Sequence, residues 1–179
     1  MSIKSLMNYT FVSKYARWDE QKKRRETWAE SVDRVRQMMI DKYASDDSNP
    51  EIIKAINKAY DDMKKKKILG SQRALQFGGS PVFKHNARIY NCIASYIDRV
   101  RFFQECMYLL LCGCGTGFSV QKHHIDKLPN LLKEKNGQKK FVIEDSIEGW
   151  SDAVGVLVSS YFKGSKLFPE YNGKTVTFD

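Results

Sequence analysis

Apolar residues in the first part of the chain recur at helical spacing. The segment from residue 18 to 43 has one apolar face, formed by Trp28, Val32, Val35 and Met39, at the 3.6-residue period of a helix. A second helix is expected to begin at Pro50, a residue that suits the first helical position, and to end near Gly70. Its apolar stripe comprises Ile52, Ile56, Tyr60 and Met63. The pattern therefore predicts a helical region over residues 1–70.

Strand and helix patterns alternate after residue 70. Residues rich in β-formers fill the range Ile89–Ile97, which we interpret as a strand with Cys92 near its middle. Alternation along this strand places Cys92 on one face with Tyr90, Ala94 and Tyr96. A helix is predicted over Val100–Leu111, and the glycine-rich stretch Gly113–Gly117 follows it. Backbone in such a stretch can approach a ligand closely.

The remaining sequence repeats the order strand, helix, strand. A short strand is expected near Phe141–Ile143 and another over Lys174–Asp179. Asp145 resembles a helix N-cap, with Glu148 completing a capping box. The apolar positions of the helix between the strands are Ile147, Trp150, Val154, Leu157 and Tyr161. Because parallel strands need neighbours on both edges, the pattern predicts an incomplete α/β fold, with a small self-contained sheet as the alternative.

Composition narrows the class of protein. A formal charge of +9 would attract phosphates on nucleic acid, lipid or nucleotides, and a 42% hydrophobic share fits a globular chain. The N-terminus lacks the apolar run of a signal peptide. The most apolar segment, Cys106–Cys112, is much shorter than the roughly 20 residues that span a bilayer. A cytoplasmic protein without a membrane partner is expected, with cysteines that stay reduced.

The cysteines and histidines do not form a recognisable metal motif. Cys92, Cys106, Cys112 and Cys114 lack the paired C-x(2–4)-C spacing of zinc sites, so no metal site is assigned. By residue type alone, Cys92 and Cys106 would be buried and unreactive. The adjacent His123 and His124 lie in a charged segment and are expected at the surface. The stretch Gly113–Gly117 matches neither the nucleoside-triphosphate nor the dinucleotide loop pattern.

Four blocks, in order, are similar to the large chain of ribonucleotide reductase, above all to its monomeric adenosylcobalamin-dependent kind. They are Tyr15–Trp18 with Arg25–Trp28, Ser71–Gly79 leading to Asn91 and Cys92, Gly113–Val120, and Glu148–Trp150 at the start of a helix. The family usually has glycine where this chain has Cys114. This difference puts the backbone conformation there, and any direct ligand contact, in doubt.

The resemblance implies a fold and a reaction. A helical N-terminal region over residues 1–70 would lead into residues 71–179, the first part of a ten-stranded α/β barrel. The reaction would replace the 2′-hydroxyl of a ribonucleotide by hydrogen through a thiyl radical, with adenosylcobalamin as cofactor and an external dithiol, such as a thioredoxin-like protein, as reductant. The family's radical-bearing cysteine comes later in a full chain. This chain is therefore expected to need a C-terminal polypeptide, and no direct contact with nucleic acid is expected.

The resemblance also assigns roles to residues. Cys92 would be a reducing thiol that forms a disulfide with a cysteine absent from this chain. Residues near the substrate would be Ser71, Asn91, Gly113 and Gly115, and lysines that meet effector phosphates would be Lys133, Lys135 and Lys139. Two alternatives remain open. One is a non-catalytic module that binds nucleotides or a reductase subunit through its basic surface, and the other is the iron-dependent class of the same enzyme.

Overall fold

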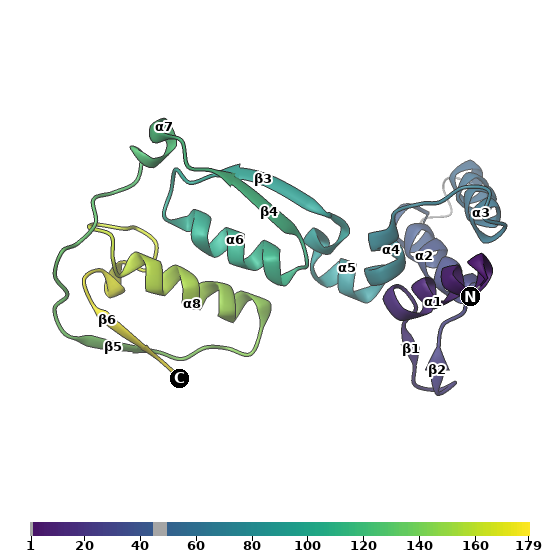
Figure 1. Cartoon of the computed structure of the whole chain (residues 1–179), viewed down its shortest axis with the longest axis horizontal. Coiled ribbons are helices and arrows are strands. Elements are labelled where there is room, and N and C mark those ends of the chain that lie inside the picture. Colours follow the sequence, from purple (N-terminus) through teal and green to yellow (C-terminus); the bar gives the residue numbers. More distant parts are fainter. Residues whose placement is uncertain (1, 45–49) are drawn as a thin grey trace. The chain divides into compact units, whose positions relative to one another are not determined.

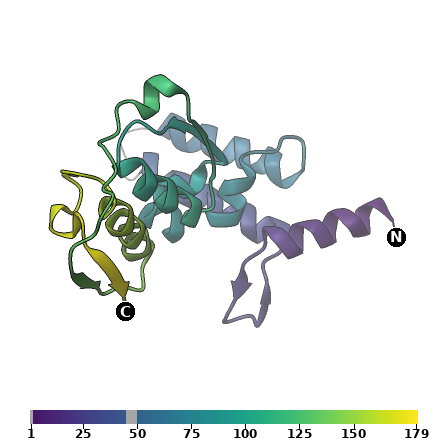
Figure 2. The ribbon, with the colours of Figure 1, turned by 60° about the vertical axis from the view of Figure 1, so that its left-hand side comes forward.

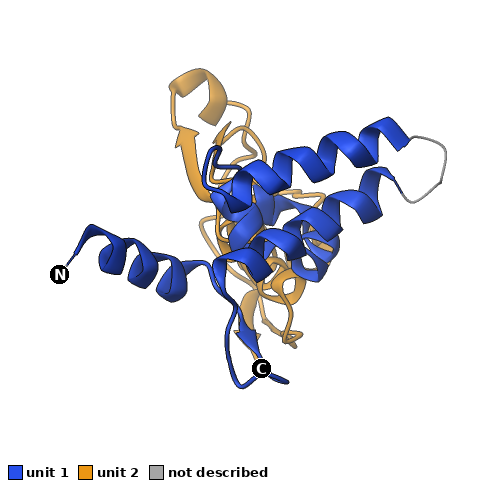
Figure 3. Cartoon of the chain, turned by 90° about the vertical axis from the view of Figure 1, so that its right-hand side faces the viewer, with its two compact units in different colours: residues 1–89 blue, residues 90–179 orange. Residues whose placement is uncertain are grey.

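The computed structural model describes residues 2–44 and 50–179 and divides the chain into two compact units. Unit 1 comprises residues 1–89 and unit 2 comprises residues 90–179 (Figure 3). The boundary predicted after residue 70 falls inside unit 1. No helix of the described residues is both long and apolar enough to cross a bilayer.

Unit 1 is mainly helical (Figure 1). Its elements are α1 (Ile3–Lys14), β1 (Trp18–Asp19), β2 (Arg24–Arg25), α2 (Trp28–Tyr43), α3 (Pro50–Lys64), α4 (Gln72–Phe77), α5 (Ser80–Lys84) and the 3-10 turn η1 (Asn86–Ile89). Helix α1 has no buried residue and extends away from the rest of the unit (Figure 2). The two short strands form an antiparallel hairpin.

The core of unit 1 lies where α2 packs against α3 and α4. Its buried residues are Val32, Val35, Met38, Met63, Ala74 and Leu75. The predicted apolar face of α2 is confirmed, because Val32 and Val35 are buried while Trp28 and Met39 pack against the core. Only the last part of the predicted α3 stripe is buried, since Met63 is enclosed whereas Ile52 is exposed.

Two predicted helix boundaries in unit 1 are wrong. The first helix begins at Trp28 instead of residue 18, because Thr27 and Glu30 form a capping box that starts α2 there. Residues 18–25 form the hairpin instead. Helix α3 ends at Lys64 before reaching Gly70, and Lys66 adopts the left-handed conformation with a φ of 58°.

Unit 2 contains two strand–helix–strand motifs (Figure 1). Its elements are β3 (Cys92–Tyr96), α6 (Arg101–Leu111), β4 (Gly115–Ser119), α7 (Lys122–Ile125), β5 (Gln138–Phe141), α8 (Ile147–Ser159), the 3-10 turn η2 (Pro169–Tyr171) and β6 (Thr175–Phe178). Strands β3 and β4 are parallel, as are β5 and β6, and helices α6 and α8 pack side by side. The predicted α/β character is confirmed, while the sheets of the described residues are two-stranded.

Several strand predictions in unit 2 need correction. Strand β3 begins at Cys92, so this cysteine is the first residue of the strand and not its middle. The preceding residues, 86–89, form η1. Strand β4 was not predicted, because its sequence begins with the glycine-rich stretch. Strand β5 ends at Phe141, where the predicted strand begins.

The start and the buried face of α8 also differ from expectation. The N-cap is Ser146 instead of Asp145, because the Ser146 hydroxyl accepts a hydrogen bond of 2.9 Å from the Gly149 N–H. The buried side of α8 carries mostly small residues, namely Gly149, Ser151, Ala153, Gly155, Val156 and Ser159. Trp150 and Leu157, from the predicted stripe, are 48% and 38% exposed. Gly155 has no room for a side chain, because an added Cβ would lie 2.9 Å from Phe168 Cε2 and 3.3 Å from Gln104 Cβ of α6.

Candidate functional site

The parallel pair β3–β4 leaves one of its faces uncovered. Cys92 lies opposite Gly115 in the register, Ala94 opposite Gly117, and Tyr96 opposite Ser119. Residues paired in this way point to the same side of a sheet. On that side Cys92, Ala94 and Tyr96 are all exposed, and both glycines are exposed as well. We call this side the open face.

Helix α6 covers the opposite side of the same strands. Ile93, Ser95 and Thr116 line a cavity together with residues of α6. The ring of Phe118 packs edge-on against Phe102 of α6, with 5.2 Å between ring centroids. The hydrophobic contacts of α6 therefore fix β3 and β4, and with them the direction in which the Cys92 thiol points.

Glycine in β4 keeps the Cys92 thiol accessible. A Cβ placed on Gly115 would lie 3.8 Å from Cys92 Sγ and 3.6 Å from the Asn91 carbonyl oxygen. A Cβ on Gly117 would meet no atom within 4 Å. Cys92 is exposed, so the prediction from residue type alone that it would be buried is wrong. A nucleophilic thiol therefore stands at the edge of a surface built from backbone and small side chains.

Backbone and thiol hydrogen bonds fix residues 113–115, where the chain passes from α6 into β4. The Gly115 N–H donates a 2.7 Å hydrogen bond to the Asn91 carbonyl oxygen. Gly113 has a φ of 89°, a conformation that favours glycine, and its N–H donates to the Leu110 carbonyl at the end of α6. Cys114 is buried, and its thiol donates to the Tyr90 carbonyl at 3.5 Å. Asn91 and Gly115 thus lie beside Cys92, and Gly113 forms the turn between α6 and β4 in the same unit.

The remaining predicted site residues are not part of strands β3 and β4. Ser71 belongs to unit 1, where it caps α4 by accepting a hydrogen bond from the Ala74 N–H at 3.3 Å. Lys135 Nζ lies 3.3 Å from the centroid of the Tyr161 ring. Lys139 Nζ lies 4.5 Å from the centroid of the Tyr171 ring. Lys135 also donates to Ser160 Oγ at 3.1 Å, whereas Lys133 is exposed.

An aromatic stack at the far end of the open face was not predicted. The Tyr96 ring stacks on His124 with 4.5 Å between centroids, and His123 lies 3.9 Å from His124. Partial loss of hydration lowers the pKa of His124, and the neighbouring His123 and Lys127 lower it further. These influences, opposed by the charge of Asp98, favour the neutral form of His124. Strand alternation signalled that Tyr96 shares a face with Cys92, but nothing local in the sequence indicated the contact with α7.

Within residues 2–44 and 50–179, no group of three or more His, Cys, Asp or Glu side chains is arranged to hold a metal ion.

Comparison with known proteins gives one informative likeness. No protein-family model matches the sequence, and no curated protein matches it. The fold is similar to the crystal structure of a B-12 dependent (class II) ribonucleotide reductase, with a TM-score of 0.80 and 19% sequence identity. The match covers 96% of this chain and 32% of the other. The chain therefore has the fold of part of a B-12 dependent (class II) ribonucleotide reductase, as its sequence blocks indicated.

Proposed function

We propose that this chain is the N-terminal part of a ribonucleotide reductase and that Cys92 is one of its two reducing thiols. The observation that carries the proposal is the exposed Cys92 thiol beside Gly115 on the open face, in a chain with this fold. Asn91 and Gly113, which fix the strands around the thiol, are proposed to lie near the substrate.

Two thiols supply the two electrons and two hydrogens that the proposed reduction of a ribonucleotide requires. Cys92 and a second cysteine each give up a hydrogen and join in a disulfide, the 2′-hydroxyl of the ribonucleotide leaves as water, and hydrogen takes its place. An external dithiol then reduces the disulfide and restores both thiols. Adenosylcobalamin would supply the radical that starts the reaction. We assign it to the C-terminal polypeptide, and no residue of this chain is proposed to bind it.

Complementation tests this function. The chain is mixed with a C-terminal reductase polypeptide, adenosylcobalamin, a dithiol and a ribonucleotide, and deoxyribonucleotide is measured. We expect product with the wild-type chain and none with Cys92→Ser. The matched control is Cys106→Ser, which removes a half-buried thiol of α6 and is expected to retain turnover.

Two outcomes would contradict the proposal. Full turnover by Cys92→Ser would remove the role assigned to this thiol. Failure of every C-terminal polypeptide to give product, together with saturable nucleotide binding by the chain alone, would favour the non-catalytic module. Activity that required a separate iron-containing subunit instead of adenosylcobalamin would assign the chain to the iron-dependent class.

A further inference from the structure

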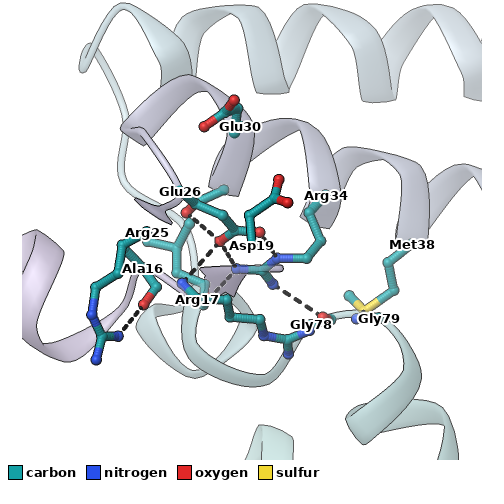
Figure 4. A network of polar contacts seen from close by, with 12 residues as sticks. Ala16, Arg17, Asp19, Arg25, Glu26, Glu30, Arg34, Met38, Gly78 and Gly79 are labelled. Carbon is teal, nitrogen blue, oxygen red and sulfur yellow. Dashed lines mark hydrogen bonds and ion pairs between the residues drawn. The ribbon is translucent and has the colours of Figure 1, made fainter. Parts of the chain in front are cut away.

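The end of helix α4 in unit 1 is held by arginines from earlier in the chain. Arg34 donates from Nη2 to the Leu75 carbonyl at 2.7 Å. Its Nη1 donates to the Gly78 carbonyl at 3.0 Å (Figure 4). Its Nε also donates to Glu26 Oε1 at 2.7 Å. The acceptors of the chain itself therefore satisfy Arg34, which has a structural role at the carbonyl end of α4.

Arg17 is bound less completely than Arg34. Its Nε donates to the Gln76 carbonyl at 3.2 Å, but its enclosed Nη2 has no hydrogen-bond acceptor. The side chain extends toward Gly79 (Figure 4). A Cβ placed on Gly79 would lie 3.9 Å from Arg17 Nη1 and would meet no other atom within 4 Å. Arg17 therefore has an enclosed Nη2 without an acceptor, and its Nη1 lies beside the open position at Gly79.

Arg88 adds a second positive charge beside Arg17. Its guanidinium lies 5.5 Å from the centroid of the Phe77 ring, and its enclosed Nε has no acceptor. Burial lowers the pKa of Arg17, and repulsion from Arg34 and Arg88 lowers it further, against the attraction of Glu26. The Glu26 carboxylate is engaged by Arg34 in a paired hydrogen bond. Arg17 and Arg88 thus lie close enough to repel each other while the nearby carboxylate serves Arg34.

We propose that Arg17 and Arg88 form a binding site for a phosphate-type oxyanion beside the turn 77–79 of unit 1. Guanidinium groups present planar pairs of N–H donors that match the oxygens of phosphate. A bound oxyanion would accept hydrogen bonds from the terminal N–H groups of the two guanidiniums, with Arg17 Nη1 beside the open position at Gly79, and would relieve the repulsion between the two charges. The ligand is inorganic phosphate or polyphosphate, or the phosphate tail of a nucleotide. The site lies in a unit that contributes no group to the thiol chemistry proposed for Cys92.

Titration of the full chain with pyrophosphate at fixed ionic strength, followed by calorimetry, tests this site. Wild-type protein is expected to bind with saturation. Arg88→Gln is expected to weaken binding about tenfold, which corresponds to about 1.4 kcal/mol. The matched control is Lys67→Gln, which removes the same charge from a side chain that is 67% exposed and is expected to change affinity less than about twofold. Absence of saturable binding, or equal losses in both variants, would overturn the proposal.

A conservative variant and a second set of ligands distinguish loss of the binding site from misfolding and identify the type of phosphate compound that binds. Arg88→Lys keeps the charge but loses the planar donor pair, so we expect it to bind more weakly than wild type and more tightly than Arg88→Gln. Equal binding by wild type and both Arg88 variants would refute the site. Tripolyphosphate and a ribonucleoside triphosphate are compared next: equal affinity identifies polyphosphate chemistry alone, and tighter nucleotide binding identifies a nucleotide's phosphate tail. Cys92→Ser is expected to bind pyrophosphate like wild type, so this result is separable from failure of the reductase function.

Discussion

Replacing Gly115 by alanine would place a methyl group beside the Cys92 thiol. The new Cβ would lie 3.8 Å from Sγ and 3.6 Å from the Asn91 carbonyl oxygen, which is ordinary van der Waals contact. Gly115 does not have a positive φ, so alanine is compatible with the backbone there. We expect the free energy of unfolding to stay unchanged or to rise by up to about 1 kcal/mol, because alanine loses less conformational entropy than glycine on folding.

The expected effect is on the reactivity of Cys92. The added methyl group restricts the approach of a reagent from the β4 side, and we expect alkylation by iodoacetamide to slow about threefold, equivalent to about 0.65 kcal/mol in the barrier. Alkylation is followed at each cysteine separately by mass spectrometry of peptides. Cys112 and Cys114 are buried and serve as slow internal references in the same sample.

Gly117→Ala is the matched control, because Gly117 lies in the same strand and on the same face but no atom lies within 4 Å of its added Cβ. This variant has the same change in composition and a similar effect on the unfolded chain. We expect it to leave the alkylation rate of Cys92 unchanged. Equal slowing by both variants, or no slowing by Gly115→Ala, would refute the view that Gly115 controls access to the thiol.

Three further predictions concern stability and are measured by urea unfolding. Glu26→Gln is expected to cost about 3 kcal/mol, because it leaves the guanidinium of the nearly buried Arg34 without its paired carboxylate. Burial is the largest single influence and would raise the pKa of Glu26, but hydrogen bonds from Arg34, Ser31 and the Arg17 N–H, with the charge of Arg34, together outweigh it and lower the pKa. This stability is therefore present at neutral pH and is lost as pH falls below the ordinary range of a glutamate. Leu75→Ala, at a fully enclosed core position of unit 1, is expected to cost about 3 kcal/mol. Ser146→Ala removes the N-cap of α8 and is expected to cost about 1 kcal/mol, whereas Asp145→Ala changes little.

Local sequence signals predicted elements better than element boundaries. The apolar period marked the core face of α2 because this helix packs on both α3 and α4. It did not reveal the hairpin before Trp28, which depends on how Thr27 and Glu30 bond to each other's backbone. In α8 the largest apolar residues suggested the wrong buried face, because close packing against α6 selects small residues over large ones.

Strand alternation predicted which side chains of the candidate site share a face of β3, and the sequence predicted little else about this site. Alternation correctly placed Cys92, Ala94 and Tyr96 on one face of β3. The exposure of that face depends on its pairing with Gly115 and Gly117, which are more than twenty residues away, and single-sequence periodicity carries no information on such pairing. The sequence likewise did not indicate a joint site for Arg17 and Arg88, because the contact of Arg17 with the Gln76 carbonyl and that of Arg88 with the Phe77 ring are tertiary contacts.

The arrangement of the cysteines bears on where the second reducing thiol must come from. Cys92 is exposed on the open face, whereas Cys114, which precedes β4, is buried with its thiol bonded to the Tyr90 carbonyl. Cys106 belongs to α6 and lines the cavity on the covered side of β3 and β4. Thiols whose Cβ vectors point apart cannot join in a disulfide without backbone movement. If Cys92 ends the proposed cycle as a disulfide, its partner therefore has to approach the open face from a strand or loop outside β3, β4 and α6.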